Sequence, residues 1–553
     1  MSRYTALAVL MIVTVSPDAV AQADYILHNA HIYTVNRDQP IAGAMAVRGE
    51  RILEVGSEHD ILQAYPHVPR VDAGGRTVLP GLIDAHVHLM GLGIGMLQVD
   101  LAGTASIDEV VERLRAFERT LTRGAWLQGR GWDQNDWPGQ AFPTRSDLDA
   151  AFPDRPVWLV RVDGHAAWAN TAAIKFVGEE VLRVAPDPEG GKIVRDARGN
   201  PTGVFVDAAM GIVGQHIPPP GQEELEQALR LALRETARYG ITSVHDAGID
   251  LKMIDVYRRA IDEGWFHLRL YGMINGRGAT LDHICEHGPI RDYGGRLVVR
   301  SVKYYIDGAL GSRGAALLAA YSDDPGNSGL LFQSAERFVT DVQHAIECGL
   351  QVNTHAIGDR GVRVVLDAYE HAMRNGNAGS GRHRIEHAQV VSLEDITRFA
   401  RLGLIASMQP THATSDMYWA EDRLGPERIR GAYAWRRFLD AGVTVPFGSD
   451  FPVEQVNPFL GFYAAVTRQD RSGWPEGGWY PDQRLTREEA LRAFTLDAAY
   501  AAFQEDELGS LEPGKYADFI VLDRDVMTVP EAEIPEVKVI ATYLSGKPVY
   551  GGL

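Results

Sequence analysis

The sequence predicts an α/β protein: a (β/α)8 barrel of the TIM type, a small β-sandwich domain formed from both chain ends, and an insertion after barrel strand one. Two observations carry this prediction. Eight buried, strand-like segments alternate with helical segments through the middle of the chain, as they do in barrel proteins. Short strand-like segments separated by glycine-containing turns occupy both ends. One barrel would then account for most of a length that, at roughly 150 residues per domain, otherwise implies several domains.

The composition is that of a soluble globular protein, with 45% hydrophobic and 23% charged residues. The 54 Lys and Arg residues against 73 Asp and Glu residues give a net charge of −19. Nucleic-acid binding is therefore not expected, because it needs clustered Lys and Arg. Two cysteines, Cys285 and Cys348, cannot build a disulfide framework or a Cys-rich zinc finger. A metal site in this chain would use His, Asp, Glu or Lys, and the expected partner is a small-molecule substrate; homo-oligomerisation is left open.

The first 23 residues have the features of a secretory signal peptide. Arg3 gives a positive start, Thr5–Val15 is nearly all apolar, and Ala21-Gln22-Ala23 has the small-x-small form of a cleavage site. An uncleaved anchor is the alternative, but this apolar stretch is short for a bilayer. We therefore expect an exported protein, periplasmic or secreted in a bacterium, with no membrane span after leader removal. An oxidising compartment would permit a disulfide between the two cysteines, a pairing that the sequence leaves open.

The two chain ends, residues 24–78 and 506–553, are expected to form the composite β-sandwich domain. Its strand-like segments are Ile32–Val35, Ala44–Val47, Arg51–Gly56, Phe519–Leu522 and Val537–Leu544. The barrel would occupy residues 79–505, including an inserted lid subdomain at about 100–220, which is too long for a single crossover.

The barrel strands are expected, in chain order, at Leu79–His88, Ile241–Ala247, His267–Ile274, Leu297–Ile306, Leu350–Ile357, Arg384–Val390, Leu404–Gln409 and Val443–Gly448. Helical segments follow most of them, at Leu251–Glu263, Ala335–Cys348, Arg360–Arg374 and Leu393–Leu402. Residues at the carboxyl ends of these strands would lie together at one face of the barrel, where barrel enzymes hold their active sites.

Strand one ends in His86-Val87-His88. Residues i and i+2 of a strand point to the same face, so both imidazoles can reach one metal ion. A His-x-His pair alone is weak evidence, but strand four carries Lys303 in an otherwise apolar run. A lone buried lysine is costly unless it is paired or modified. The alternative for Lys303 is a buried stem with an amine that extends to the barrel mouth.

Strands five, six and eight also end in groups that can bind metal: His355, His387 and Asp450. Any one of them could be a structural polar residue. Together with His86, His88 and Lys303 they follow the order of the barrel strands, and this predicts a metal centre at the carboxyl ends of the strands.

These segments resemble the amidohydrolase superfamily and, within it, amidohydrolase family 3, the YtcJ-like branch that includes N-substituted formamide deformylase. The resemblance covers nearly the whole chain after the leader. The matching segments are residues 80–88 (PGLIDAHVH), 163–165 (DGH), 303–308 (KYYIDG), 354–359 (THAIGD), 385–387 (IEH), 448–454 (GSDFPVE) and 509–518 (GSLEPGKYAD).

The resemblance implies that the metal ligands are His86, His88, Lys303, His355, His387 and Asp450. The expected cofactor is Zn²⁺, as one or two ions, with another divalent metal left open. A carbamylated Lys303 would bridge two ions; unmodified, it would act electrostatically beside one. Asp450, His387 and Lys303 are the expected catalytic residues. Asp450 would carry the proton between water and leaving group, and His387 or His412 would stabilise the oxyanion.

Five further residues are candidates for substrate binding: Trp132, His165, Asp307, Arg313 and His412. The first two lie in the insertion, the next two follow Lys303, and His412 follows strand seven. For Trp132, ordinary packing is an equally good interpretation.

The leading functional hypothesis is a metal-dependent hydrolase that cleaves a non-peptide C–N bond in an amide, N-formyl or N-acyl group. A deaminase, or a carbamate or ester hydrolase of the same superfamily, is the alternative. A deaminase is expected to carry His-x-x-Glu on strand five without the strand-four lysine, whereas this chain has His355-Ala356-Ile357-Gly358-Asp359 and Lys303. A remote alternative is an exported solute-binding protein, which would not need a buried metal constellation.

Overall fold

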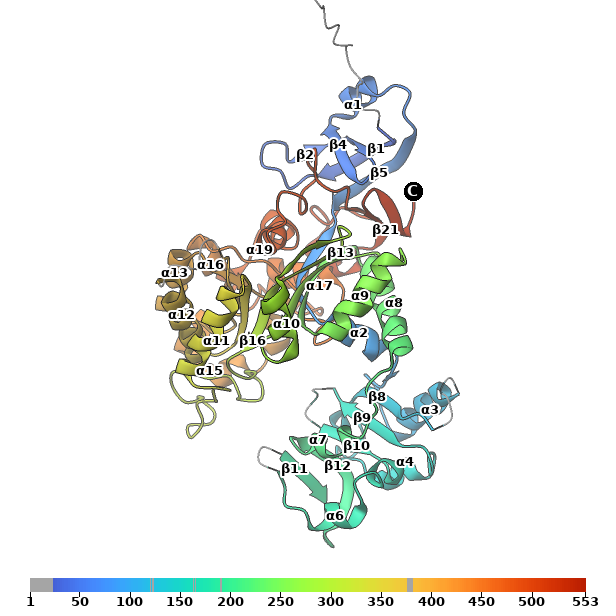
Figure 1. Cartoon of the computed structure of the whole chain (residues 1–553), viewed down its shortest axis with the longest axis vertical. Coiled ribbons are helices and arrows are strands. Elements are labelled where there is room, and N and C mark those ends of the chain that lie inside the picture. Colours follow the sequence, from blue (N-terminus) through green and yellow to red (C-terminus); the bar gives the residue numbers. More distant parts are fainter. Residues whose placement is uncertain are drawn as a thin grey trace, which may run out of the picture.

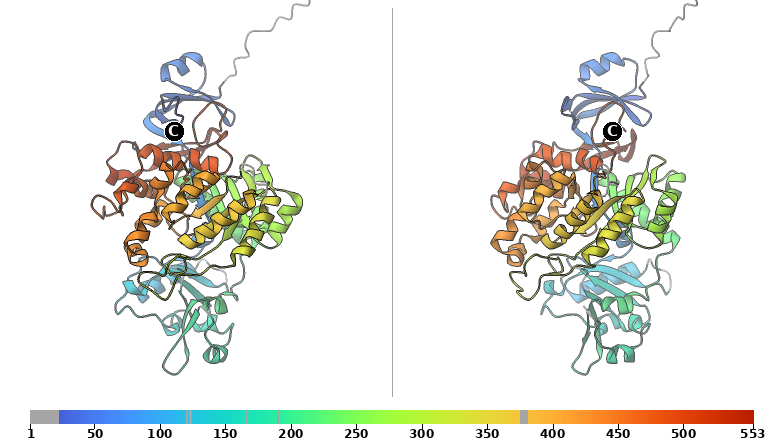
Figure 2. Two further views of the ribbon diagram at one scale, coloured as in Figure 1. Left: turned by 90° about the vertical axis from the view of Figure 1, so that its left-hand side faces the viewer. Right: turned by 60° about the vertical axis from the view of Figure 1, so that its left-hand side comes forward.

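The computed structural model describes residues 23–119, 121, 124–162, 164, 166–188, 191–374 and 381–553. The predicted signal peptide, except Ala23, and the candidate substrate residue His165 lie outside these ranges. Figure 1 shows three parts in a row: a sheet from the chain ends at the top, a barrel with its helices in the middle, and an insertion at the bottom. The two further views in Figure 2 show the same order.

The barrel sheet contains seven parallel strands in the order β19-β18-β17-β16-β14-β13-β6. These strands are β6 (Leu82–Val87), β13 (Ile241–Ile249), β14 (Arg269–Asn275), β16 (Leu297–Tyr305), β17 (Gln351–Ala356), β18 (Arg384–His387) and β19 (Ile405–Ser407). The short strand β15 (Ile290–Tyr293) pairs antiparallel with β16 outside this order. The result is a nearly closed parallel barrel, as the alternation of strand-like and helical segments predicted.

The eighth segment closes the barrel without forming a regular strand, which corrects the expectation for Val443–Gly448. On one side, the backbone N–H of Met408 donates to Pro446 O at 3.1 Å, and that of Gly448 donates to Met408 O at 3.1 Å. On the other side, Ala85 N donates to Phe447 O at 3.0 Å. Pro446 has no N–H to donate, so the ladder is interrupted in the middle of the segment.

The first predicted strand, Leu79–His88, is divided between two sheets. Its start belongs to β5 (Arg70–Pro80), which pairs with strands from both chain ends, and its remainder is β6 of the barrel. Gly81 lies at the division, and a Cβ atom there would come 2.1 Å from Thr242 Oγ1. The chain can pass this close to β13 only because residue 81 has no side chain.

Helices cover the outside of the barrel as expected. The main ones are α8 (Gln222–Arg238), α9 (Leu251–Asp262), α10 (Ala279–His287), α11 (Ala335–Glu347), α12 (Asp359–Arg374), α13 (Leu393–Leu402), α16 (Trp435–Asp440) and α17 (Pro458–Thr467). In α12 the buried residues Val362, Val365, Leu366 and Tyr369 recur at the spacing of one helical face. Helix α9 starts where the Asp250 side chain accepts from the Met253 backbone N–H.

Strands from both chain ends pair into one sheet, in the order β22-β21-β20-β5-β1-β3-β4, with β2 beside β1. Their bounds are β1 (Tyr25–Tyr33), β2 (Ile41–Ala42), β3 (Ala44–Arg48), β4 (Arg51–Gly56), β20 (Phe519–Leu522), β21 (Val539–Leu544) and β22 (Lys547–Gly551). A hydrophobic cluster that includes Leu27, Val47 and Phe519 joins the two ends. We call this the terminal sheet; its arrangement as a sandwich stays a prediction.

The insertion has a sheet of its own, in the order β11-β12-β10-β9-β8-β7. Its strands are β7 (Val99–Asp100), β8 (Leu127–Trp132), β9 (Val157–Arg161), β10 (Ala166–Ala169), β11 (Gly191–Arg195) and β12 (Pro201–Asp207). Trp132, Trp137 and Trp168 pack together in its core. The insertion thus buries apolar residues independently of the barrel, as a separate subdomain would.

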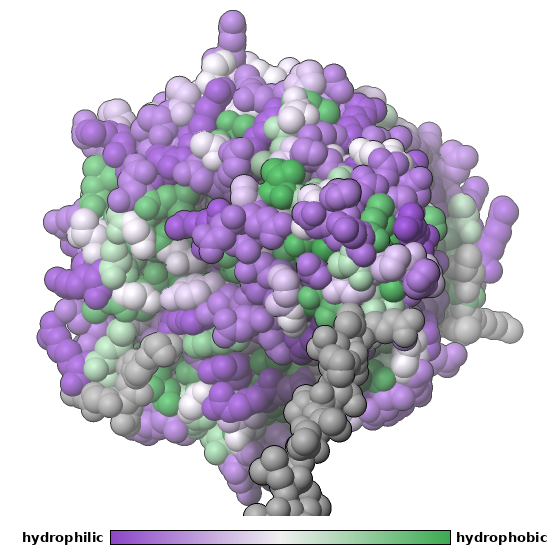
Figure 3. Space-filling model, turned by 90° about the horizontal axis from the view of Figure 1, so that it is seen from above, coloured by the Kyte–Doolittle hydropathy of each residue, from purple (hydrophilic) through white to green (hydrophobic). Residues whose placement is uncertain are grey.

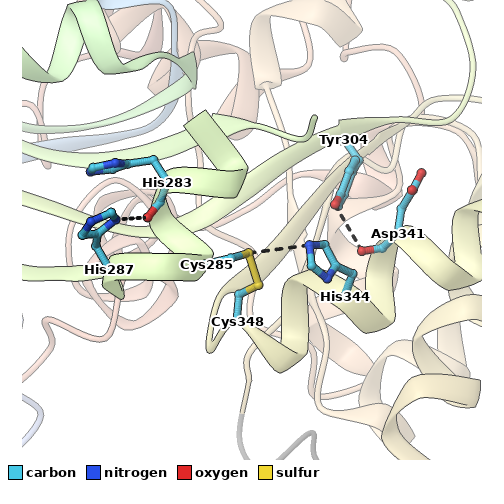
Figure 4. Close-up of a disulfide and its surroundings, with 7 residues drawn as sticks. All are labelled: His283, Cys285, His287, Tyr304, Asp341, His344 and Cys348. Atoms are coloured by element: carbon cyan, nitrogen blue, oxygen red, sulfur yellow. Dashed lines mark hydrogen bonds between the residues drawn. A yellow bond between two sulfur atoms is a disulfide. The ribbon is translucent and has the colours of Figure 1, made fainter. Parts of the chain in front are cut away.

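Cys285 in α10 and Cys348 at the C-terminal end of α11 form a disulfide, a pairing that the sequence left open (Figure 4). It joins two helices on the outside of the barrel. Among the described residues, no helix is both long and apolar enough to cross a membrane. On the face that carries the terminal sheet, hydrophilic residues predominate and hydrophobic residues occur in small groups (Figure 3).

We expect Gly448→Ala to destabilise the closed barrel. A Cβ atom at this position would lie 2.6 Å from His86 N and 2.8 Å from Asp84 Oδ1, so the closing segment would have to move away from β6. Overpacking of this kind costs roughly 1–3 kcal/mol. Thermal unfolding should show a lower Tm than for Gly95→Ala, where the added Cβ meets no atom within 4 Å. Equal Tm values for the two variants would contradict this account of barrel closure.

Candidate active site

A cavity of about 980 Å³ opens at the carboxyl ends of the barrel strands. It contains the six predicted metal ligands and His412, together with apolar and acidic wall residues. Its lining includes His86, His88, Lys303, Tyr305, Leu310, Leu330, His355, His387, Gln389, His412, Asp416, Trp419, Arg423, Asp450 and Glu454. The structure thus brings together residues that are up to 368 positions apart in the printed sequence, from His86 to Glu454.

The two histidines of β6 are held through their Nδ1 atoms. His86 Nδ1 lies 2.5 Å from Glu386 Oε2, with both side chains fully buried, and His88 Nδ1 lies 2.8 Å from Ala247 O. Since a carboxylate and a carbonyl only accept, each Nδ1 carries the proton and each Nε2 is left with a lone pair. These Nε2 atoms lie 3.7 Å and 3.3 Å from Asp450 Oδ1. Both imidazoles therefore present a metal-binding nitrogen to the same carboxylate.

His387 reaches the cavity through an irregular end of β18. Glu386 pairs with His355 in the neighbouring strand and faces the barrel interior, so regular alternation would turn His387 outward. His387 has φ +72 and Ala388 has φ +41, and this left-handed turn redirects the imidazole. The His387 Nδ1 then donates to Gln409 Oε1 at 2.8 Å. Strain of this type is typical of functional positions.

Asp450 is held by a second irregular turn, with φ +61. Its backbone N–H donates to His86 O at 2.8 Å. The preceding residue, Ser449, donates from its hydroxyl to Asp84 Oδ2 at 2.6 Å and from its backbone to Asp84 Oδ1 at 2.9 Å. Asp84 thus links strand one to the closing segment and fixes the direction of the Asp450 carboxylate.

The charges in the cavity favour metal-binding forms of these residues. Burial and, after it, the nearby Lys303 amine lower the pKa of His355 to about 3. Burial also lowers the pKa of His86 and that of His387, so all three imidazoles are neutral near pH 7. For Asp450, burial acts to raise the pKa, but the nearby imidazoles of His88, His86 and His387 hold it well below its usual value. The centre therefore combines neutral imidazoles with an ionised carboxylate.

Lys303 lies in the same cluster. Its side chain is buried, and Nζ lies 3.0 Å from His86 Nε2 and 4.7 Å from the centre of the Tyr305 ring. The amine thus lies directly beside a predicted metal ligand. This placement fits both interpretations of Lys303, as a carbamylated ligand and as a neighbouring cation.

Four buried polar atoms of the cavity lining have no hydrogen-bond partner among the described residues: His355 Nε2, His412 Nε2, Arg423 Nε and Asp450 Oδ1. Buried polar atoms normally have one, because leaving them unpaired costs about 1–3 kcal/mol each. Two sets of ligand atoms have all members within 4.8 Å of one another, and both include Asp450: one with His86 and His88, the other with His387 and His412. This donor set of imidazole and carboxylate fits a divalent ion such as Zn²⁺.

Among the described residues predicted to bind substrate, His412 alone lines the cavity. Its Nε2 lies 3.9 Å from Asp450 Oδ2, and its ring stacks on that of His387 at 6.0 Å. It comes from α14 (Pro410–Asp416), directly after β19. The structure places His412 beside the predicted metal ligands His387 and Asp450, whereas the sequence proposed it for substrate or oxyanion binding and not as a ligand.

Asp307 lies under the cavity floor rather than in its lining. It is fully buried and accepts backbone N–H groups of Ala316, Ile357 and Gly358 at 2.8–3.0 Å. These bonds hold the loop that follows β16 against the end of β17. Asp307 therefore supports the site from below, which corrects the expectation of a substrate contact.

Trp132 and Arg313 are also placed away from the cavity lining. Trp132 is fully buried in the core of the insertion, and its indole N–H donates to Leu159 O at 2.9 Å. Arg313 pairs with Asp323, at 2.9 Å from Nη2 to Oδ2. Packing in the insertion and an ion pair within the loop after β16 account for these two residues better than substrate binding does.

We expect Glu386→Gln to weaken metal binding by about 10–100-fold, the usual effect of removing a charged partner behind a metal-binding imidazole. The amide keeps an acceptor for His86 Nδ1 but lacks the negative charge that makes the imidazole a stronger donor. Competition with a chelator measures the change. The matched control is Glu394→Gln, an ion-pair partner of Arg363 on the barrel exterior. Equal metal affinity in Glu386→Gln and the unsubstituted protein would contradict the role given to Glu386.

Comparisons with known proteins agree with this geometry. A model of the amidohydrolase family matches residues 70–550, and one of an imidazolonepropionase-like composite domain of bacteria matches residues 43–67. The chain is 33% identical to the putative amidohydrolase YtcJ of Bacillus subtilis (strain 168), over 95% of this chain and 99% of that protein. It is 31% identical to N-substituted formamide deformylase of Arthrobacter pascens, over 95% and 97% of the two chains.

Among solved structures, the chain is similar to an uncharacterized metal-dependent hydrolase from Pyrococcus horikoshii OT3. The TM-score is 0.78 at 29% sequence identity, and the match covers 92% of this chain and 99% of the other. The similarity therefore includes the terminal sheet and the insertion as well as the barrel.

Proposed function

The chain belongs to the amidohydrolase family, as its motifs predicted, and we propose that it hydrolyses an amide, N-formyl or N-acyl bond of a small molecule with the help of bound Zn²⁺. It is a metal-dependent hydrolase of carbon–nitrogen bonds by family. The observation that carries the finer proposal is the cavity itself. Imidazoles and an ionised carboxylate come together there. Several of their metal-competent atoms are buried and have no hydrogen-bond partner among the described residues.

We assign the metal to His86, His88, His355, His387 and Asp450, with Lys303 as a further ligand if it is carbamylated. When bound, Zn²⁺ would polarise the substrate carbonyl and lower the pKa of a nearby water. The three Nδ1–H groups of His86, His88 and His387 stay with their acceptors, so these rings keep the orientation that metal binding requires.

Asp450 is the proton carrier in this proposal. Its Oδ1 lies among the ligand nitrogens, and its low pKa keeps it ionised at neutral pH. It accepts a proton from the attacking water and returns it to the nitrogen of the leaving amine. His412, whose Nε2 lies 3.9 Å from Asp450 Oδ2, is placed to donate a hydrogen bond to the oxyanion that develops on the substrate carbonyl.

The apolar side chains of the cavity wall suit a substrate that carries an apolar group next to the scissile bond. Tyr305, Leu310 and Trp419 line one side, and Leu330 is exposed at the rim. A relative is named N-substituted formamide deformylase, and this supports a formyl or short acyl group at the metal. Deamination is the second candidate, but Lys303 beside His86 does not fit the pattern expected of deaminases.

The test is a substrate panel on the Zn²⁺-loaded protein: N-formyl amines, N-acetyl amines, carbamates, esters and aminopurines. Product amine and acid are measured by mass spectrometry. We expect the formamides and acetamides with apolar N-substituents to be cleaved with the highest kcat/KM. Ammonia release from aminopurines without amide cleavage would show a deaminase and refute the proposal.

We also propose that the protein is exported by the predicted leader and acts in the periplasm or outside the cell. The Cys285–Cys348 disulfide supports this location, because disulfides persist in oxidising compartments. The insertion, which follows the carboxyl end of β6 and lies at the bottom of Figure 1, would act there as a lid over the substrate.

A further inference from the structure

A second cavity, of about 350 Å³, lies at the opposite end of the barrel from the active site, between the barrel, the terminal sheet and the segment after α19 (Leu496–Ala501). Five arginines line it: Arg51, Arg269, Arg291, Arg296 and Arg300. Only two carboxylates do so, in a protein whose net charge is −19. We call it the arginine cavity.

Two of these arginines have structural partners. Arg269, at the start of β14, binds both oxygens of Asp518 at 2.6 Å and 3.0 Å and stacks on Tyr516. Arg51 pairs with Glu507 at 3.0 Å and stacks on the same ring. These contacts of Arg269 and Arg51 link the barrel to the terminal sheet. They occupy Glu507, one of the two carboxylates that line the cavity.

The other three have no carboxylate partner among the described residues. Arg296 donates only to the Ser545 hydroxyl, at 3.1 Å, and Arg291, on β15, has no side-chain hydrogen bond. Arg300, on β16, stacks over Phe503 at 4.0 Å, and its Nε is buried without a partner. The second lining carboxylate, Asp292, accepts the Gly295 backbone N–H instead.

The guanidinium groups of Arg291 and Arg300 repel each other. Arg296 is repelled by Arg269, a repulsion that the carboxylates of Asp518 and Glu50 offset in part. Burial lowers the pKa of Arg300, and the neighbouring Arg291 lowers it further; Arg296 is affected in the same way by burial and by Arg269. A bound anion would remove this repulsion. Guanidinium groups bind phosphate through paired N–H donors, and a volume of this size admits a small organic group beside a phosphate.

We propose that the arginine cavity binds a small phosphate-class oxyanion, held by Arg291, Arg296 and Arg300. The site is distinct from the hydrolytic centre. Lys303 lies at the active-site end of β16, whereas Val298, near the start of the strand, lines the arginine cavity. The ligand is either free phosphate or the phosphate group of a small phosphomonoester.

Isothermal titration calorimetry tests this proposal. The metal-loaded full chain is titrated at low ionic strength with sodium phosphate and with glucose 6-phosphate, and sodium chloride at equal ionic strength is the control titrant. We expect saturable binding of one anion per chain, and roughly tenfold or greater weakening in Arg300→Gln and in Arg291→Gln. Arg198→Gln removes the same charge from an exposed position in the insertion and should bind normally.

The two ligands distinguish the source of the phosphate. Tighter binding of glucose 6-phosphate supports a phosphomonoester, and equal binding supports free phosphate. Arg291 is exposed, so its substitution tests the site without risk to folding. Absence of saturable binding overturns the proposal, and so does unchanged binding in both cavity variants, because the anion would then be at the metal centre. Hydrolytic activity does not enter these measurements.

Discussion

Asp450→Asn is expected to lower kcat by about a hundredfold to ten-thousandfold, the range that general acid–base catalysis contributes. The amide would keep the size of the side chain but could not accept the proton of the attacking water. The turn at residue 450 should be unaffected, because Ser449 and Asp84 hold it through their own hydrogen bonds. Most of the metal should stay bound through the histidines, so the loss appears in kcat rather than in metal content.

Steady-state kinetics and metal analysis of the same preparation make this comparison. Asp282→Asn, an exposed carboxylate on α10, is the matched control and should leave kcat unchanged. Retained turnover in Asp450→Asn with normal metal content would show that another group carries the proton.

Lys303→Ala is expected to reduce the metal content from two ions to one and to lower activity strongly. The reason is geometric: Nζ lies 3.0 Å from His86 Nε2, so a carbamate on this amine would share an ion with His86. Alanine removes the bridging group and leaves His86, His88 and the other ligands in place.

Metal content measured by mass spectrometry after dialysis distinguishes two ions from one. The control is Lys175→Ala, which replaces an exposed lysine of the insertion. An unchanged content in Lys303→Ala would contradict the carbamate. It would favour a single ion with an unmodified Lys303 beside it.

The barrel could be predicted because buried strands and the helices that follow them have recognisable local sequence patterns. Apolar runs such as Leu297–Ile306 and the helices after them have the periods of strand and helix, and the observed β16 is Leu297–Tyr305. The exceptions depend on contacts between distant segments. Residue 81 divides one apolar run between two sheets where it meets Thr242, and Pro446 interrupts the strand that closes the barrel.

The cavity could be predicted in part for the same reason. Strand alternation predicts that His86 and His88 point to the same side, and the apolar run around Lys303 predicts its strand. His387 reaches the cavity only through a left-handed turn that no local pattern indicates. Glu386 was missed as the partner of His86 because the two residues are 300 positions apart. Its one signal was its place directly before His387 in a matching segment.

The substrate contacts were the least predictable part. Asp307 follows Lys303 in the sequence, yet three backbone N–H groups from two other segments enclose it. The wall residues Leu310 and Trp419 come from loops whose paths depend on such long-range bonds. Sequence patterns describe strands and their ends, whereas the cavity wall is made of loops.

The most direct test of the central claim is metal dependence, measured on one preparation of the unsubstituted protein. Divalent metal content and hydrolysis of an N-formyl amine are determined before treatment with a chelator, after it, and after Zn²⁺ is restored. The account predicts one or two ions per chain, loss of activity in proportion to metal removed, and recovery with Zn²⁺. Full activity in protein that holds only a trace of metal would contradict it.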